Sequence, residues 1–193
     1  MLADTLGAVS SIPNVTVFFT PDEAEAEIAA IGDAVARTQA AAPTETRTRL
    51  PQGPGDLGGR MFRAIRHLLE GGRSDAALLV GSDIPMLTAD HVLEAADTLR
   101  AIGGVVIGPA DDGGYYLIGM TCAHAGLFED VAWGTESVLT DTLRAAERIG
   151  VDTRLVRSAY DVDTIDDLRR VERDLAVAPA AMCPQLRRWL SES

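Results

Sequence analysis

The 193-residue sequence contains no lysine, so its 17 basic residues are all arginine. This absence excludes catalysis through a lysine Schiff base and any phosphate loop that depends on a lysine. The 29 acidic residues bring the formal net charge to −12, which disfavours binding to nucleic acids and to anionic membranes. An anionic substrate would therefore need a metal ion, an arginine or backbone N–H groups to bind.

Cysteines and long apolar runs are also scarce. Cys122 and Cys183 lie far apart without ligand spacing, which favours buried or incidental thiols over a disulfide or a zinc site. No stretch approaches the roughly 20 apolar residues that span a bilayer. The first residues also lack the basic start and apolar middle of a signal peptide. We therefore expect no membrane span and a cytoplasmic protein.

The rest of the sequence alternates apolar strands with helices. Such alternation predicts a single-domain, three-layer α/β/α fold around a mostly parallel mixed sheet. We predict strands over residues 15–19, 44–50, 76–80, 105–107, 115–120 and 153–156. The predicted helices cover residues 1–10, 21–41, 60–70, 88–101, 135–149 and 185–190, with a further one beginning after 164.

The first candidate site residue, Asp83, follows an apolar run. Residues 76–80 are apolar and are bounded by Gly81 and Pro85, a pattern typical of a central parallel strand buried on both faces. Asp83 lies beyond the carboxyl end of this strand, where ligand sites form in open α/β sheets. Its carboxylate suits Mg²⁺ or Mn²⁺. Alternatively, Asp83 caps a turn or the following helix.

A second candidate carboxylate, Asp163, follows the last predicted strand. Two carboxylates from different strand ends, completed by substrate phosphates, make a credible Mg²⁺ site, so Asp163 could join Asp83 at one ion. Alternatively, Asp163 or Thr164 caps the next helix. The run Thr164-Ile165-Asp166-Asp167 resembles an acidic capping box and favours this second role.

Two acids and two glycines lie between the apolar runs at 105–107 and 115–120. Asp111 or Asp112 could orient a sugar hydroxyl or serve as a base. Gly113 and Gly114 would let the backbone approach a ligand closely. An Asp-Gly pair between strands is also a strong β-hairpin signal, and the two roles are compatible.

A glycine-rich segment, residues 52–60, leads into a predicted helix. Backbone N–H groups at such a helix start can bind a phosphate or the edge of a base. Arg60 could pair with a phosphate, or it could be a solvated helix arginine. Further along, Trp133 could stack on a ligand ring or close over the core.

Several of these segments, taken in order, recur together in one known family. They are Gln52…Gly55-Asp56-Leu57-Gly58-Gly59-Arg60-Met61, Gly81-Ser82-Asp83-Ile84-Pro85, residues 108–119, Trp133-Gly134-Thr135 and Tyr160-Asp161-Val162-Asp163-Thr164. The chain thus resembles a bacterial group of glycosyltransferases, formerly a domain of unknown function, in the nucleotide-diphospho-sugar transferase superfamily. Some members are linked to arsenosugar biosynthesis. It also looks like a distant relative of guanylyltransferases that act on molybdenum cofactor and on phospholactate.

This resemblance covers residues 1–175 and leaves 176–193 as a predicted C-terminal helical extension. It implies a GT-A type fold and a divalent ion, Mg²⁺ or Mn²⁺, bridging the nucleotide diphosphate. Asp83 matches the aspartate that carries this ion, and Asp163 matches a second acidic position of nucleotidyltransferase relatives. The resemblance further implies a base or positioning role for Asp111 and Asp112, nucleotide contacts for Gly55, Asp56, Leu57, Gly58 and Arg60, and acceptor or sugar contacts for Gly113 and Gly114.

The chain departs from the family at its start. Members usually begin with an apolar strand and a loop containing Gly, Arg or Lys that holds the nucleotide phosphates, and nothing in this sequence matches them. The missing strand would lie next to the Asp83 strand. We therefore expect sheet edges that another strand, or a second subunit in a homo-oligomer, would cover.

This resemblance, together with the candidate carboxylates, implies a metal-dependent glycosyltransferase that uses a nucleotide-diphospho-sugar and a small-molecule acceptor. Two alternatives stay open at this point. One is a guanylyltransferase-like nucleotidyltransferase acting on a small phosphorylated acceptor. The other is a diverged binding domain without activity, which the missing phosphate loop favours and the two candidate metal carboxylates oppose.

Overall fold

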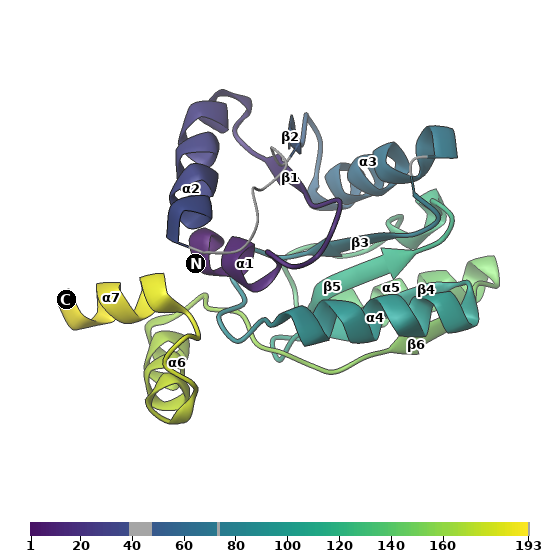
Figure 1. Ribbon diagram of the computed structural model, residues 1–193. Coiled ribbons are helices and arrows are strands. Elements are labelled where there is room, and N and C mark those ends of the chain that lie inside the picture. Colours follow the sequence, from purple (N-terminus) through teal and green to yellow (C-terminus); the bar gives the residue numbers. More distant parts are fainter. Residues whose placement is uncertain (39–47, 73, 193) are drawn as a thin grey trace. The chain divides into compact units, whose positions relative to one another are not determined.

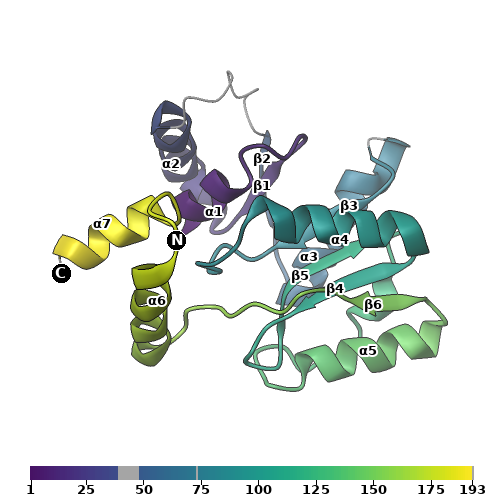
Figure 2. The ribbon, with the colours of Figure 1, turned by 60° about the horizontal axis from the view of Figure 1, so that its bottom comes forward.

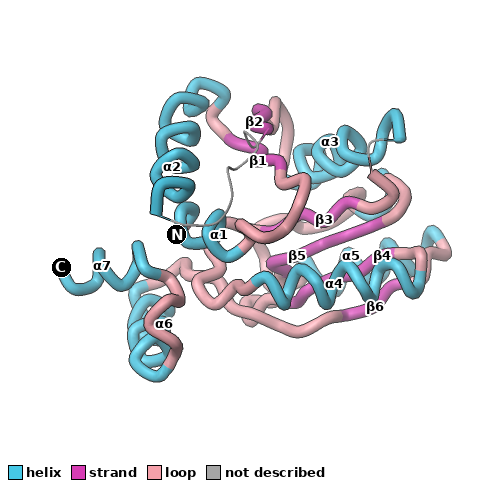
Figure 3. The backbone as a smooth tube through the Cα atoms, viewed as in Figure 1, coloured by secondary structure: helices cyan, strands magenta, loops and turns pink. Residues whose placement is uncertain are grey.

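Helices and strands alternate along the chain in the computed structural model, which describes residues 1–38, 48–72 and 74–192 (Figures 1 and 3). This alternation confirms the predicted α/β class. The elements fall into two compact units. The first comprises Met1–Pro51, Ser82–Ala89 and Tyr160–Ser193, and the second comprises Gln52–Gly81 and Asp90–Ala159.

The second unit is built around a four-stranded mixed sheet. Its strands are β3 (Ala77–Val80), β4 (Val105–Pro109), β5 (Tyr115–Met120) and β6 (Thr153–Leu155). They lie in the order β3-β5-β4-β6. Strand β5 is antiparallel to both β3 and β4, whereas β6 is parallel to β4. The sheet is therefore of the mixed type.

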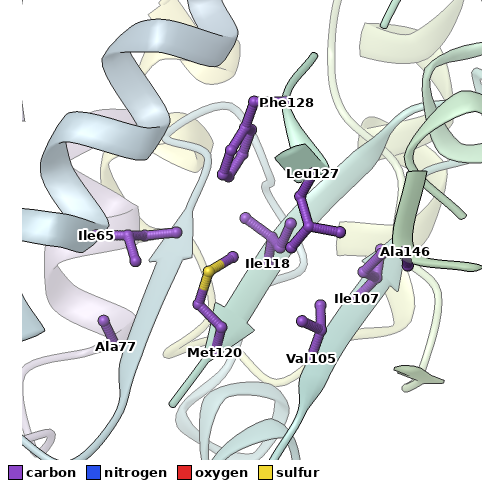
Figure 4. Close-up of a cluster of buried hydrophobic side chains, with 9 residues drawn as sticks. All are labelled: Ile65, Ala77, Val105, Ile107, Ile118, Met120, Leu127, Phe128 and Ala146. Carbon is purple, nitrogen blue, oxygen red and sulfur yellow. The ribbon is translucent and has the colours of Figure 1, made fainter. Parts of the chain in front are cut away.

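Helices cover both faces of this sheet. Figure 2 shows α4 (Ala89–Ile102) on one face and α5 (Val138–Ile149) on the other. On the α5 face, Ile65 of helix α3 (Leu57–Leu69) and Ala146 of α5 join one buried cluster (Figure 4). The other members of this cluster are Ala77, Val105, Ile107, Ile118, Met120, Leu127 and Phe128. The second unit thus has the predicted α/β/α layers, and the 110–114 turn joins its strands β4 and β5.

The first unit contains two parallel strands, β1 (Thr16–Phe19) and β2 (Thr48–Pro51), in register from Thr16 with Thr48. The 3-10 turn η1 (Asp22–Ala24) and helix α2 (Glu25–Thr38) follow β1. Strand β2 confirms part of the strand predicted over 44–50. The rest of that prediction and the end of the predicted second helix fall on residues 39–47, which lie outside the described residues.

Three further helices belong to this unit: α1 (Leu2–Ala8), α6 (Ile165–Val177) and α7 (Pro184–Glu192). The Asp4 carboxylate of α1 is buried and accepts hydrogen bonds from the backbone N–H groups of Gln185 and Leu186, at 2.9 and 3.0 Å. Because these N–H groups at a helix start have no partner within the helix, Asp4 caps α7 across the sequence. Both cysteines are free thiols, with Cys122 exposed and Cys183 buried.

The strand before Asp83 differs from its prediction. Strand β3 lies at one end of the four-stranded sheet and is antiparallel to β5, rather than central and parallel. Only Ala77 of its residues is fully buried. A continuous apolar run indicates burial but carries no information about the direction of the neighbouring strand, so the sequence could not decide between these pairings. The covering of sheet edges by a further strand or a second subunit stays a prediction.

Candidate functional site

The glycine-rich segment begins with a loop that helix α3 holds in place. Asp56 is the N-cap of α3, and its Oδ1 accepts a hydrogen bond from the Gly59 N–H at 2.8 Å. The helix therefore begins at Leu57, three residues before the predicted start. The sequence placed Gly58 and Gly59 in the loop because glycine disfavours helices, but the Asp56 cap outweighs this preference.

Two arginines of α3 reach back to this loop. Arg60 donates from Nη1 to Oε1 of Gln52 at 3.1 Å and from Nε to the Asp56 carbonyl at 3.3 Å. Arg63 donates to the Gln52 carbonyl, and to the Pro54 carbonyl at 2.7 Å. The sequence analysis missed Arg63. Its spacing of one helical turn from Arg60 was the available signal, because side chains at that spacing share a helix face.

Gly58 packs directly on the indole of Trp133. A Cβ atom at residue 58 would lie 2.6 Å from the Trp133 ring. Trp133 stacks on Phe128, with ring centroids 6.4 Å apart, and forms a T-shaped contact with Tyr115, also with ring centroids 6.4 Å apart. Phe128 belongs to the buried cluster. Trp133 therefore closes over the core, the second of its two predicted roles.

The predicted Asp-Asp-Gly-Gly hairpin joins β4 to β5. The Asp112 carboxylate accepts a hydrogen bond from the Gly114 N–H at 2.8 Å, which shapes the turn. Gly113 has φ +90°, and a Cβ atom there would lie 2.2 Å from the Glu136 carbonyl oxygen. The Gly113 carbonyl in turn accepts from the Leu139 N–H at 2.9 Å. The turn is thus fixed against the segment that leads into α5.

That segment, residues 132–137, is braced by its own polar side chains. Thr135 was predicted to cap α5, but its hydroxyl donates to the Ala132 carbonyl at 2.8 Å, and the helix begins after Ser137. The predicted segments 55–60 and 111–114 both contact this 132–137 segment within the second unit, the first through Gly58 with Trp133 and the second through Gly113 with Glu136.

The two predicted metal ligands belong to neighbouring segments of the first unit. The Val162 N–H donates to the Asp83 carbonyl at 3.2 Å, which places the segment after β3 beside the segment before α6. Asp83 and Asp163 are both exposed. The helix cap belongs to Thr164, whose hydroxyl accepts from the Asp167 N–H at 3.2 Å in a complete capping box. The Asp163 carboxylate is therefore not needed for capping.

Electrostatics also secure the segment before α5. The Ser137 hydroxyl donates to Asp141 Oδ2 at 2.8 Å, and Arg144 pairs with Oδ1 at 3.1 Å. These contacts, led by the Ser137 hydrogen bond, hold the pKa of Asp141 below its usual range. Nearby, burial raises the pKa of Tyr115 well above its ordinary value, so this phenol stays neutral.

We expect the Asp141 carboxylate to make the stability of the fold decrease in acid. A carboxyl whose pKa is lower in the folded state stabilises the fold above its unfolded pKa of about 3.9, and the contribution is lost as pH falls through the folded value. Urea unfolding midpoints, followed by Trp133 fluorescence in a Trp189→Phe background between about pH 5 and pH 2, should fall more steeply with Asp141 in place than in Asp141→Asn. Asp22→Asn, which removes an exposed carboxylate elsewhere, should keep the wild-type slope. Parallel curves for wild type and Asp141→Asn would contradict the assignment.

Comparison with known proteins identifies a family for this chain. The family model described as "Uncharacterized protein conserved in bacteria (DUF2064)" matches residues 10–135, well over half of the chain. The chain belongs to this family. The DUF2064 match spans the 55–60 segment, Asp83, the 111–114 turn and Trp133, whereas Asp163 lies beyond it. No curated protein matches the chain.

One solved structure resembles this DUF2064 chain over its whole length. It is the crystal structure of a "putative nucleotide-diphospho-sugar transferase" from Desulfovibrio desulfuricans G20, with a TM-score of 0.81 and 26% sequence identity. The match covers 100% of this chain and 83% of the other. The fold is therefore of the nucleotide-diphospho-sugar transferase type, which confirms the predicted fold class. Among the described residues, no helix is both long enough and apolar enough to cross a membrane.

Proposed function

We propose that the protein is a metal-dependent glycosyltransferase that takes its sugar from a nucleotide-diphospho-sugar. The similarity to the Desulfovibrio desulfuricans protein supports the donor class. The observation that carries the metal proposal is the hydrogen bond from Val162 to Asp83, because it brings together the two segments that bear Asp83 and Asp163.

These two side chains fit a hard divalent cation. Carboxylate oxygens are the ligands that Mg²⁺ and Mn²⁺ prefer, and both carboxylates are exposed to solvent. Asp83 and Asp163 would hold the ion, and the negative charges of the two carboxylates would balance its positive charge. The bound ion would supply charge neutralisation for a departing nucleoside diphosphate.

Two segments of the second unit would carry the nucleotide and acceptor contacts. Gly55, Leu57 and Gly58 would offer backbone N–H groups to the nucleotide, while Asp56 and Arg60 hold the loop in shape. Gly113 and Gly114 allow close approach of the acceptor or sugar. Asp111 would serve as the base that takes the proton of the acceptor hydroxyl, with Asp112 shaping the turn from which it extends.

A thermal-shift panel tests the metal and donor parts of the proposal. UDP- and GDP-linked sugars with Mn²⁺ should raise the melting temperature by about 5–10 °C at about 100 times Kd. Asp83→Asn and Asp163→Asn should each lose the Mn²⁺-dependent part of this shift. Asp22→Asn removes another exposed carboxylate of the same unit and should respond like the wild type. Identical responses in all variants would overturn the metal assignment.

Product analysis distinguishes sugar transfer from nucleotidyl transfer. Sugar transfer releases a nucleoside diphosphate from the labelled nucleotide-sugar. Release of pyrophosphate from a nucleoside triphosphate would instead identify a nucleotidyltransferase. If no nucleotide or nucleotide-sugar stabilises the wild type, the transferase proposal is wrong, as expected for a diverged domain without activity.

A further inference from the structure

The guanidinium of Arg63 lies inside the curve of the loop before α3. It donates from Nη1 to the Gln52 carbonyl and from Nη2 to the Pro54 carbonyl, the latter at 2.7 Å. A guanidinium offers several N–H donors in a rigid plane, so one side chain can hold two carbonyls at fixed positions. Hydrogen bonds from a charged donor are also stronger than those between neutral groups.

These two contacts fix the direction of two N–H groups. In a planar trans peptide, the C=O of one residue and the N–H of the next point in opposite directions. The carbonyls of Gln52 and Pro54 point to Arg63, so the N–H groups of Gly53 and Gly55 point away from it. The structure shows no hydrogen bond from either N–H to another described residue.

The residue types of the loop suit this arrangement. Gly53 and Gly55 have φ values of +71° and +107°, which residues with a side chain rarely adopt. A Cβ atom at residue 53 would lie 3.2 Å from Nη1 of Arg63. Pro54 between them has no N–H, so it adds no competing donor. Arg60 restrains the same loop through the Gln52 side chain.

We infer that Arg63 is a positioning residue, which turns the Gly53 and Gly55 N–H groups outward to bind acceptor oxygens of the donor nucleotide. The inference rests on the proposed function. It assigns Arg63 a role that acts through the loop backbone, without contact to the substrate. Acceptor oxygens occur on both the base and the phosphates of a nucleotide, so the probes must include each part alone.

Amide exchange and ligand binding test this inference together. The variants are Arg63→Met, Arg63→Lys and the control Arg66→Met, which removes an exposed arginine of the same helix that pairs with Glu70 at 3.2 Å. NMR follows the Gly53 and Gly55 amides with Mg²⁺ and UDP, GDP, uridine, guanosine or pyrophosphate. In the wild type, these amides should exchange their hydrogens fast without ligand. With the nucleotide that binds, the exchange should be slower by about tenfold or more.

Arg63→Met should shift both glycine amides without ligand and weaken nucleotide binding about 10- to 100-fold, while circular dichroism shows a folded chain. Arg63→Lys should recover part of the affinity, because an ammonium group keeps the charge but not the planar fork. Arg66→Met should bind like the wild type. Slowed exchange with pyrophosphate alone would assign the N–H groups to phosphate, and slowed exchange with a nucleoside alone would assign them to the base.

Two outcomes would overturn the inference, and they differ from failure of the proposed function. If Arg63→Met leaves the glycine amides and the nucleotide affinity unchanged, Arg63 does not position the loop, although the nucleotide site stands. If the nucleotide binds without protecting either amide, the N–H groups do not contact it. If the wild type binds none of the probes, the proposed function itself is wrong, and the inference falls with it.

Discussion

Gly113→Ala should destabilise the second unit by about 2–5 kcal/mol. A Cβ atom at this position would lie 2.2 Å from the Glu136 carbonyl oxygen and 2.8 Å from the Glu136 carbonyl carbon. Both atoms are backbone, so the clash can be relieved only if the turn or the segment before α5 moves. Overpacking of this kind costs about 1–3 kcal/mol, and the φ of +90° adds about 1–2 kcal/mol for a residue with a side chain.

Gly134→Ala separates these two contributions. Gly134 also has a positive φ, +77°, but a Cβ atom there would meet no atom within 4 Å. This control should therefore lose only the strain energy of about 1–2 kcal/mol. Urea unfolding of both variants gives the comparison. Equal losses would show that the contact between Gly113 and Glu136 does not constrain the turn.

The same comparison bears on function. The Asp111–Gly114 turn is where we propose that the acceptor or sugar approaches, and its position depends on contacts with the 132–139 segment. A shifted turn would move Asp111 away from the position in which we propose that it acts as a base. We therefore expect Gly113→Ala to lose transfer activity even where the protein remains folded, whereas Gly134→Ala should lose less.

Local patterns predicted the elements better than the links between them. The Asp-Gly hairpin, the Thr164 capping box and helix α4 were all predicted, because each depends on residues close in sequence. The direction of β3 was not, because it depends on which strand lies beside it. The start of α3 was placed too late, because a single carboxylate, Asp56, outweighs two glycines at the first turn.

The candidate site shows the same division. The sequence and its family resemblance pointed to the segments 55–60, 83, 111–114 and 163, and the functional roles of these segments stay predictions. The sequence could not show that Gly58 packs on Trp133, which lies far along the chain. Nor could it show that Arg63 bonds to the carbonyls of Pro54 and Gln52, 9 and 11 residues before it. Such contacts depend on the packed structure, and a substitution at Gly58 tests one of them directly.

Gly58→Ala should destabilise the protein by up to about 2 kcal/mol, although the same substitution stabilises most helices. Replacing a helical glycine by alanine gains about 0.5–1 kcal/mol, because the unfolded chain loses conformational freedom. At Gly58, the added Cβ would lie 2.6–2.7 Å from three atoms of the Trp133 indole. Moving this ring disturbs its contacts with Phe128 and Tyr115, and overpacking costs about 1–3 kcal/mol.

Gly32→Ala in helix α2 is the matched control. A Cβ atom at residue 32 would meet only Nη1 of Arg49, at 3.6 Å, which is an ordinary contact. This variant should be more stable than the wild type by about 0.5–1 kcal/mol. The two variants share one chemical change, so opposite signs of the change in unfolding free energy would isolate the contact with Trp133.

Fluorescence can report the movement of the ring itself. The chain has two tryptophans, so a Trp189→Phe background leaves Trp133 as the sole indole. In this background, Gly58→Ala should shift the emission of Trp133 to longer wavelength, since the displaced ring becomes more exposed to water. Gly32→Ala should leave the emission unchanged. If Gly58→Ala instead stabilises the protein without changing the emission, the position of Trp133 does not depend on the absence of a side chain at residue 58. The contact between Gly58 and Trp133 would then not hold the 55–60 segment against the 133–135 segment.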